Sequence, residues 1–210
     1  MRTLEHTTQG APAVALGLLS GSYSAVEDFV REGFPVAAGE NGIAAWVVMA
    51  EVRAAYFSDG SIVRRIRESV IEPARARGLS RIWLAGISLG GLAALSFAAR
   101  HAGDVERIVL MSPYPGTREV LREIEAAGGL AAWRPEEAPP DPERDAWAWL
   151  RAGAKGARVE CYFGSDDRFA DGQRRIAACL PPAAVHEVAG GHEWKDWRGM
   201  WSDFLERNRP

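Results

Sequence analysis

The chain contains very little cysteine. Among its 210 residues only Cys161 and Cys179 occur, and neither belongs to a CxxC motif or to a Cys/His pair. This scarcity argues against a disulfide framework and against a zinc site with cysteine ligands. We therefore expect a cytoplasmic protein that holds no metal and needs no cofactor.

Strong net charge and long apolar runs are also absent from the sequence. The formal net charge is −3 and no block of like charge occurs, so neither nucleic acid nor a membrane is an expected partner. No apolar run approaches the length of a membrane span. Residues 11–19 could pass for the apolar part of a signal peptide, but Arg2 is the one Lys or Arg before them and Glu5 lies close by. A first buried strand is the favoured interpretation of this stretch.

Two common ligand-binding motifs are missing as well. The glycines at 86, 90 and 91 do not fit the G-x-G-x-x-G pattern of dinucleotide-binding proteins. The stretch 193–196 lacks the second histidine of a metalloprotease helix. Neither a dinucleotide nor a catalytic metal is therefore expected.

The sequence does contain a regular alternation of short apolar runs and longer amphipathic ones. Strand-like runs cover 13–19, 44–52, 81–87, 105–111, 157–163 and 184–188, and several are apolar at nearly every position. Helix-like segments cover 25–32, 61–77, 89–101, 173–180 and 195–207. This alternation predicts a single α/β domain over residues 1–210, with a doubly wound, mostly parallel sheet of about six strands flanked by helices. Ligands of such sheets bind beyond the carboxyl ends of the strands.

Residues 113–156 interrupt the alternation. Two short helical patterns, at 117–127 and 142–152, are separated by a proline-rich stretch at 135–142. Insertions of this length are often lids over a site, although a solvated surface excursion is the simpler alternative. Trp133, Trp147 and Trp149 favour a helical lid, because three tryptophans in a polar segment need an apolar surface to cover.

Ser88 lies in Gly86-Ile87-Ser88-Leu89-Gly90, a G-x-S-x-G motif placed between a predicted strand and a predicted helix. A sharp strand-to-helix turn forces the serine into a strained backbone conformation, which is tolerable when the residues two before and two after it lack side chains. The helix that follows points its first amide groups at incoming negative charge. Ser88 is thus a candidate nucleophile and the Leu89 N–H a candidate oxyanion donor.

A nucleophilic serine needs a base and an acid that orients the base. The strand at 157–163 leads into Asp166 and Asp167, and the strand at 184–188 leads into a Gly-Gly pair and His192. The order serine, aspartate, histidine is the order of the hydrolase triad. We favour Asp167 as the acid, while Asp166 could serve after a one-residue change in the turn.

These residues resemble the α/β-hydrolase family over nearly the whole chain, from the strand at 13–19 through the turn at 86–90 to the turns at 164–167 and 191–192. The resemblance implies a short member of the fold, without the antiparallel strands that usually open it. It also implies a second oxyanion amide in the loop after the first parallel strand, often within a His-Gly-x sequence. Ser20-Gly21-Ser22 stands in that place here, with Ser20 where the family often has histidine.

Carried over to this chain, the family roles fall on five residues: Ser88 as nucleophile, His192 as base, Asp167 as orienting acid, and the N–H groups of Leu89 and Ser22 as oxyanion donors. The resemblance implies a serine hydrolase that cleaves an ester or related acyl bond of a small-molecule substrate through an acyl-enzyme. A thioesterase or an acyltransferase would use the same triad. A non-catalytic binding protein of the same fold is the alternative from another class. The sequence leaves the natural substrate and the oligomeric state open.

Overall fold

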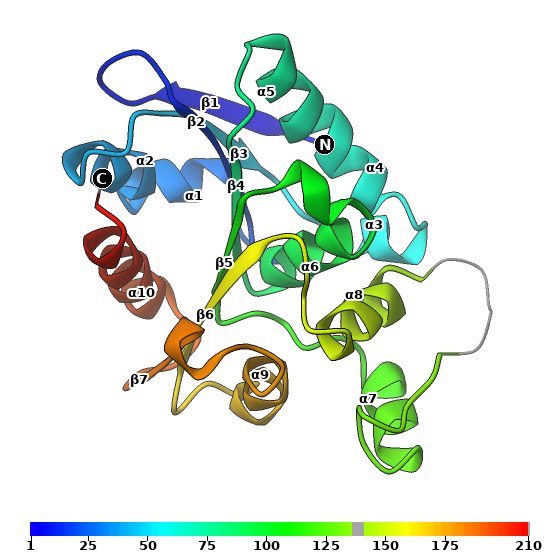
Figure 1. The fold of residues 1–210 in the computed structure, drawn as a ribbon. Coiled ribbons are helices and arrows are strands. Elements are labelled where there is room, and N and C mark those ends of the chain that lie inside the picture. The colour runs from blue at the N-terminus through cyan, green and yellow to red at the C-terminus, as the bar shows by residue number, and fades with distance from the viewer. Residues whose placement is uncertain (136–140, 210) are drawn as a thin grey trace.

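The computed structural model describes residues 1–135 and 141–209, which form a seven-stranded sheet in the order β1-β3-β2-β4-β5-β6-β7 (Figure 1). The strands are β1 (Thr3–Thr7), β2 (Val14–Leu19), β3 (Ala45–Ala50), β4 (Ile82–Ile87), β5 (Arg107–Met111), β6 (Arg158–Gly164) and β7 (Val185–Val188). Strand β1 runs antiparallel to β3, and every other pair of neighbours is parallel. The predicted α/β fold with a mostly parallel sheet is confirmed.

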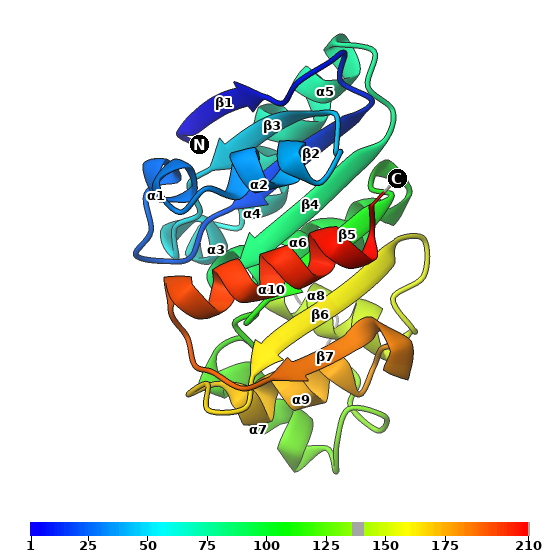
Figure 2. The same ribbon diagram turned by 90° about the vertical axis from the view of Figure 1, so that its left-hand side faces the viewer.

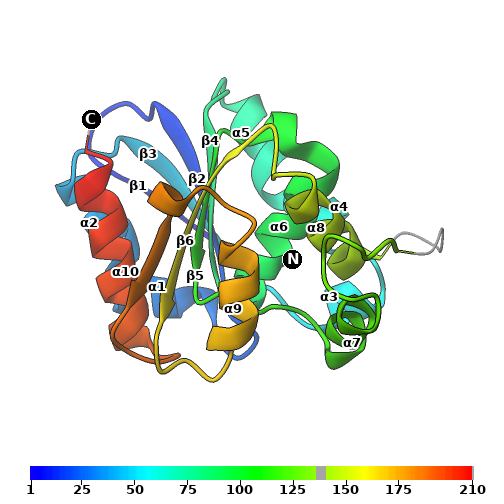
Figure 3. The ribbon, with the colours of Figure 1, turned by 60° about the horizontal axis from the view of Figure 1, so that its bottom comes forward.

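Helices cover both faces of this sheet. One face carries α1 (Val26–Arg31), α2 (Phe34–Glu40) and α10 (Trp194–Arg207), which lie in front of the strands in Figure 2. The opposite face carries α4 (Ile62–Ile66), α5 (Glu72–Ala76), α6 (Leu89–His101) and α8 (Pro142–Arg151), and Figure 3 shows the two layers on either side of the sheet. The remaining described α-helices are α3 (Ala55–Ser58), α7 (Arg118–Ala126) and α9 (Ala170–Ala177).

The continuous apolar runs are explained by burial on both faces. All six residues of β2, of β3 and of β4 are buried. Because successive side chains of a strand point to opposite faces, Leu16 contributes to the core beside α10 while Ala15 contributes to the core beside α6. A strand that feeds two cores has no polar face, which is why these strands lack the alternation of a half-exposed sheet.

Strand β1 corrects the expectation that the chain lacks antiparallel opening strands. All five of its residues are exposed, and their sequence, TLEHT, carries no apolar periodicity. The strand is held by its backbone ladder to β3, from Thr3 opposite Ala50 to Thr7 opposite Trp46. The Trp46 indole N–H also donates to the Glu5 carboxylate, at 2.9 Å. An edge strand held mainly by main-chain bonds leaves no hydrophobic signature, so the expectation of about six strands was one short.

The helix expected at 61–77 is divided into three parts. A π-helical segment, Arg67–Ile71, separates α4 from α5. Pro73 lies in the first turn of α5, where it has no N–H to donate and its ring displaces the carbonyl four residues earlier, so a widened turn precedes it. Helix α2 was not predicted, because its short sequence contains both Pro35 and Gly39.

The segment 113–156 contributes α7 and α8, close to the two predicted helices. Trp133 and Trp147 are buried, and the Trp147 indole donates to the Pro115 carbonyl at 2.9 Å. Helix α8 packs along α6, and its Ala146, Trp147 and Leu150 join the core on that face. Residues 136–140 of the proline-rich stretch lie outside the described residues. The lid role of this segment stays a prediction.

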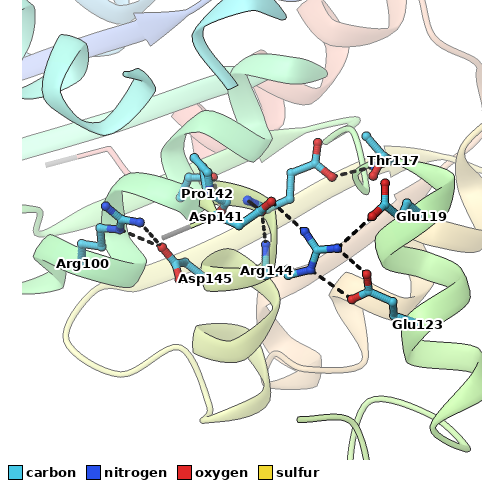
Figure 4. A network of polar contacts seen from close by, with 10 residues as sticks. Arg100, Thr117, Glu119, Glu123, Asp141, Pro142, Arg144 and Asp145 are labelled. Carbon is cyan, nitrogen blue, oxygen red and sulfur yellow. Dashed lines mark hydrogen bonds and ion pairs between the residues drawn. The ribbon is translucent and has the colours of Figure 1, made fainter. Parts of the chain in front are cut away.

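Charged side chains join this segment to the rest of the domain (Figure 4). The Arg144 guanidinium binds the carboxylates of Glu119 and Glu123 on α7 and of Asp141 at the start of α8. Arg100 on α6 pairs with Asp145 on α8. Helix α7 is therefore tied to α8, and α8 to α6.

None of the helices formed by residues 1–135 and 141–209 has both the length and the apolar composition required to cross a membrane.

Candidate active site

Ser88 occupies the sharp turn between β4 and α6. Its backbone has φ 51° and ψ −115°. This conformation is unfavourable in free energy for a residue that carries a side chain, and the surrounding structure holds Ser88 in it. A Cβ at Gly86 would overlap the carbonyl of Gly90, and a Cβ at Gly90 would overlap the carbonyl of Leu19. The G-x-S-x-G spacing is therefore a steric requirement of the turn.

Hydrogen bonds on both sides fix the Ser88 backbone. Its N–H donates to the Met111 carbonyl at 3.1 Å, and its carbonyl accepts the N–H groups of Gly91 at 2.9 Å and Tyr114 at 2.8 Å. This strand-to-helix turn at residues 86–90, called the elbow below, is thus held both by its own helix and by the segment that follows β5. This support gives the serine hydroxyl a defined position at the carboxyl edge of the sheet.

His192 approaches Ser88 from the loop between β7 and α10. Its Nε2 lies 2.9 Å from the Ser88 Oγ, and its Nδ1 lies 2.7 Å from the Asp167 Oδ2. Phe169 and Trp197 stand edge-on to the imidazole, with ring centroids 5.3 and 5.2 Å away. These rings restrict the imidazole to the plane in which its two nitrogens face the serine and the aspartate.

Asp167 is brought to His192 because the turns after β6 and β7 cross closely. A Cβ at Gly164 would overlap the carbonyl of Gly190, so the crossing depends on a bare backbone at position 164. The β6 and β7 arrowheads point to the same edge of the sheet in Figure 2. Asp166, the alternative acid, is exposed, and its N–H donates to the Gly190 carbonyl at 2.9 Å. The structure therefore places Asp167, and not Asp166, against the histidine.

The Asp167 carboxylate is buried and accepts three hydrogen bonds. Its Oδ1 accepts the Phe169 backbone N–H at 2.8 Å, and its Oδ2 accepts from His192 and from the Gln173 Nε2, the latter at 3.0 Å. Burial alone would raise the pKa of this carboxyl, but the hydrogen bonds from His192, Phe169 and Gln173 outweigh it and hold the pKa below its ordinary value. Asp167 is therefore ionised at neutral pH.

The two residues predicted to supply oxyanion donors, Leu89 and Ser22, both lie beside Ser88. Leu89 is the first residue of α6, and Ser22 lies in the loop after β2; both line the same cleft as Ser88. Within the described residues, no backbone carbonyl accepts the N–H of either one. A Cβ at Gly21 would lie 3.6 Å from the Ser88 Cβ, so this loop passes close to the serine. The N–H groups of Leu89 and Ser22 therefore stay candidates for binding an anionic oxygen beside Ser88.

Ser20, at the position where histidine was expected, fixes the loop that carries Ser22. Its hydroxyl is buried, donates to the Gly21 carbonyl at 3.1 Å and accepts the Val52 N–H at 3.0 Å. A small hydroxyl therefore ties the loop after β2 to the segment after β3.

The cleft above Ser88 has a volume of about 680 Å³. Its walls include five Tyr, Phe and Trp side chains: Tyr23, Tyr114, Phe169, Trp194 and Trp197. The charged side chains that line it are Arg168 and Glu193. This lining suits a small substrate with an apolar part. Among residues 1–135 and 141–209, no three His, Cys, Asp or Glu side chains gather in a way that could hold a metal ion.

Sequence reasoning missed several residues of this site. Tyr114 and Phe169 follow strands, as Ser88, Asp167 and His192 do, and that position was the available signal for them. Gln173 contacts the Asp167 carboxylate from within α9, and a lone glutamine in an amphipathic helix gives no such signal. Trp194 and Trp197 belong to the aromatic run after His192 and line the cleft with one edge of α10.

Comparison with known proteins agrees with this geometry. The family model described as "Putative esterase" matches residues 72–205. No curated protein sequence matches the chain. Among solved structures, the fold is similar to FphF, a fluorophosphonate-binding serine hydrolase of Staphylococcus aureus, with TM-score 0.66 and 15% identity over 94% of this chain and 84% of that one.

Two further structures are similar over most of their length. Est1E from Butyrivibrio proteoclasticus has TM-score 0.67 and 16% identity, covering 98% of this chain and 91% of that one. The S-formylglutathione hydrolase FrmB of Staphylococcus aureus has TM-score 0.62 and 18% identity, covering 94% and 82%. At these identities the structures show a shared fold, and the family match covers most of the chain. This chain therefore belongs to the Esterase family and is an enzyme of the α/β-hydrolase type.

Proposed function

We propose that the protein is a serine hydrolase that cleaves an ester bond of a small-molecule substrate through an acyl-enzyme on Ser88. The observation that carries the proposal is the chain of hydrogen bonds from Ser88 to His192 at 2.9 Å and from His192 to Asp167 at 2.7 Å. In this proposal Ser88 is the nucleophile, His192 the general base and Asp167 the orienting acid.

In the first half of the proposed reaction, the Ser88 Oγ attacks the acyl carbonyl carbon while its proton passes to the His192 Nε2. The carbonyl oxygen becomes an oxyanion that accepts the N–H groups of Leu89 and Ser22. Collapse of this intermediate breaks the ester C–O bond, and His192 returns its proton to the departing alcohol. Asp167 keeps the other imidazole proton on Nδ1, so that Nε2 presents a lone pair to the serine.

In the second half, a water molecule takes the place of the alcohol and attacks the acyl carbon. His192 accepts the water proton and a second oxyanion forms against the same amides. Its collapse breaks the bond to Ser88 while His192 returns the proton to the serine Oγ. The products are the free acid and the regenerated serine. The same acyl-enzyme could instead pass its acyl group to an alcohol. We assign hydrolysis because Ser22, Tyr23 and Glu193, which line the cleft, are exposed to solvent and leave it accessible to water.

We also propose a cytoplasmic location. Support comes from the two cysteines, which are both free, with Cys161 buried. Burial raises the pKa of the Cys161 thiol to about 12, so this thiol is unreactive.

The test is hydrolysis of p-nitrophenyl esters of increasing acyl length, compared with acyl-CoA thioesters of the same acids. Wild-type protein should turn over the short oxygen esters, and Ser88→Ala should reduce the rate to that of the buffer. Ser202→Ala, an exposed serine on α10, is the matched control and should retain full activity. Faster turnover of the thioesters would replace the esterase assignment with a thioesterase. Equal rates for wild type and Ser88→Ala would refute the proposed nucleophile.

A further inference from the structure

Gln173 is a fully buried polar side chain on α9, six residues after Asp167. Its Nε2 lies 3.0 Å from the Asp167 Oδ2 and 3.3 Å from the Pro113 carbonyl oxygen. The same Oδ2 receives the His192 Nδ1 at 2.7 Å. A single carboxylate oxygen is therefore shared by the histidine and the glutamine.

The chemistry of its two neighbours fixes which way the Gln173 amide faces. An ionised carboxylate and a peptide carbonyl can only accept hydrogen bonds, so the NH2 group must point at both of them. The Oε1 atom is then left buried with no hydrogen-bond partner among the described residues. A buried acceptor without a partner lowers the stability of the fold. Packing alone therefore does not explain why an amide side chain occupies position 173.

The Pro113 contact links the glutamine to the segment that holds the nucleophile. Pro113 directly precedes Tyr114, whose N–H donates to the Ser88 carbonyl at 2.8 Å. A Cβ at Gly91, on the helix that begins at the elbow, would lie 2.9 Å from the Pro113 Cβ. Gln173 therefore connects the Asp167 carboxylate to the strand-end segment packed against the elbow.

We propose that Gln173 is a positioning residue that holds the Asp167 carboxylate at the angle from which Oδ2 receives the His192 Nδ1–H. The inference rests on the proposed function, because it assigns Gln173 a role only through the triad. The Phe169 N–H fixes Oδ1 and the Gln173 amide fixes Oδ2, so the two donors together set the rotation of the carboxylate. Without the amide, the carboxylate can rotate about the Phe169 contact, and His192 loses its fixed orientation toward Ser88. The Gln173 hydrogen bond is also one of those that hold the pKa of the Asp167 carboxyl below its ordinary value.

The first test replaces the amide with an apolar side chain of similar length. Gln173→Met should lower kcat by about 10- to 100-fold, the range expected for a hydrogen bond to a charged group, with KM changed by less than about threefold. Thermal stability should fall only modestly, because the Asp167 Oδ2 and the Pro113 carbonyl lose a donor while the orphaned Oε1 is removed as well. Ile176→Ala, a buried residue one turn later on α9, is the control and should lose stability while keeping kcat. The reverse pattern, a destabilised Gln173→Met with unchanged kcat, would overturn the inference.

The second test uses Gln173→Glu, whose effect must depend on pH. While protonated, the introduced carboxyl can donate its O–H to the Asp167 Oδ2 as the amide does. Once ionised, it places a second negative charge beside Asp167, and burial and repulsion should shift this ionisation to a raised pH. The ratio of variant to wild-type kcat should therefore fall as pH rises. A ratio independent of pH would contradict the positioning role.

A spectroscopic measurement separates this inference from the proposed function. The proton between the His192 Nδ1 and Asp167 should give a far-downfield proton NMR signal in the wild type, whether or not a substrate is known. Gln173→Met should shift or broaden that signal, and Ile176→Ala should not. An unchanged signal in Gln173→Met overturns the inference. Failure of the proposed function would instead appear as wild-type protein without esterase activity.

Discussion

Replacing Asp167 with asparagine should abolish most activity while leaving the fold intact. The Phe169 backbone N–H donates to Oδ1 at 2.8 Å, and only the asparagine carbonyl oxygen can take that position. The asparagine NH2 must then take the position of Oδ2, where it faces the His192 Nδ1 and the Gln173 Nε2. A donor opposite Nδ1 favours the tautomer with its proton on Nε2. That tautomer has no lone pair for the Ser88 proton.

Two magnitudes follow from these contacts. The wrong tautomer should cost about 10⁴-fold in kcat, which corresponds to about 5 kcal/mol of transition-state stabilisation. The opposed NH2 groups of the asparagine and Gln173 should cost about 1–3 kcal/mol in the free energy of unfolding. The loss of activity should thus far exceed what partial unfolding could cause.

The assay is hydrolysis of a short p-nitrophenyl ester together with urea unfolding of the same preparations. Asp166→Asn is the matched control, because Asp166 is exposed and contributes its backbone N–H, not its carboxylate, to the turn. Its activity should stay within about threefold of the wild type, as expected for a surface substitution. If Asp166→Asn were the more damaging of the two variants, the assignment of Asp167 as the orienting acid would be wrong.

Three further predictions concern the elbow, acid stability and the α7–α8 segment. Gly90→Ala should cost about 3 kcal/mol or more in the free energy of unfolding measured by urea titration, because the added Cβ would overlap the Leu19 carbonyl. The control is Gly199→Ala, where a Cβ meets nothing within 4 Å, and it should be neutral or stabilising by about 0.5–1 kcal/mol. The pKa of the Asp167 carboxyl in the folded protein is lowered from its ordinary value of 3.8, so its contribution to stability is complete above pH 3.8 and is lost as pH falls through the folded value. The free energy of unfolding in urea should therefore show no change from this group between pH 7 and pH 5. At pH 3 it should show a loss that Asp167→Asn lacks. Arg144→Ala removes the guanidinium that binds three carboxylates on α7 and α8, and should speed hydrogen exchange of the α7 amides by about 10-fold without speeding exchange in the sheet.

The sheet and the elbow were predictable because their determinants are local. A strand buried on both faces must be apolar throughout, and a strained serine between close backbones requires glycine at 86 and 90. Both requirements are met by residues that lie close together in the sequence. Strand β1 was not predictable in this way, because its main-chain bonds to β3 need no particular side chains.

Part of the site was predictable from topology and part was not. Since parallel strands end at one edge of the sheet, the residues after β4, β6 and β7 had to come together. The choice between Asp166 and Asp167 depends on the angle of one turn, which the sequence does not specify. Gln173 reaches the site through the packing of α9 against the segment at Pro113, a tertiary contact without a sequence motif.

The insertion shows a different limit of sequence reasoning. Its tryptophans indicated an apolar surface to cover, and Trp133 and Trp147 are indeed buried in the core on the α6 face. Tyr114 is the described residue of this segment that lines the cleft. Burial of aromatic residues was therefore predictable, whereas the surface they cover depended on how α8 packs.

Covalent labelling tests most directly whether Ser88 is the nucleophile. Folded wild-type protein should react with a fluorophosphonate probe to give one adduct per chain, which peptide mass spectrometry should locate on Ser88. Ser88→Ala should give no adduct, while Ser202→Ala should react as the wild type does. An adduct on another residue, or no adduct on folded wild-type protein, would contradict the account.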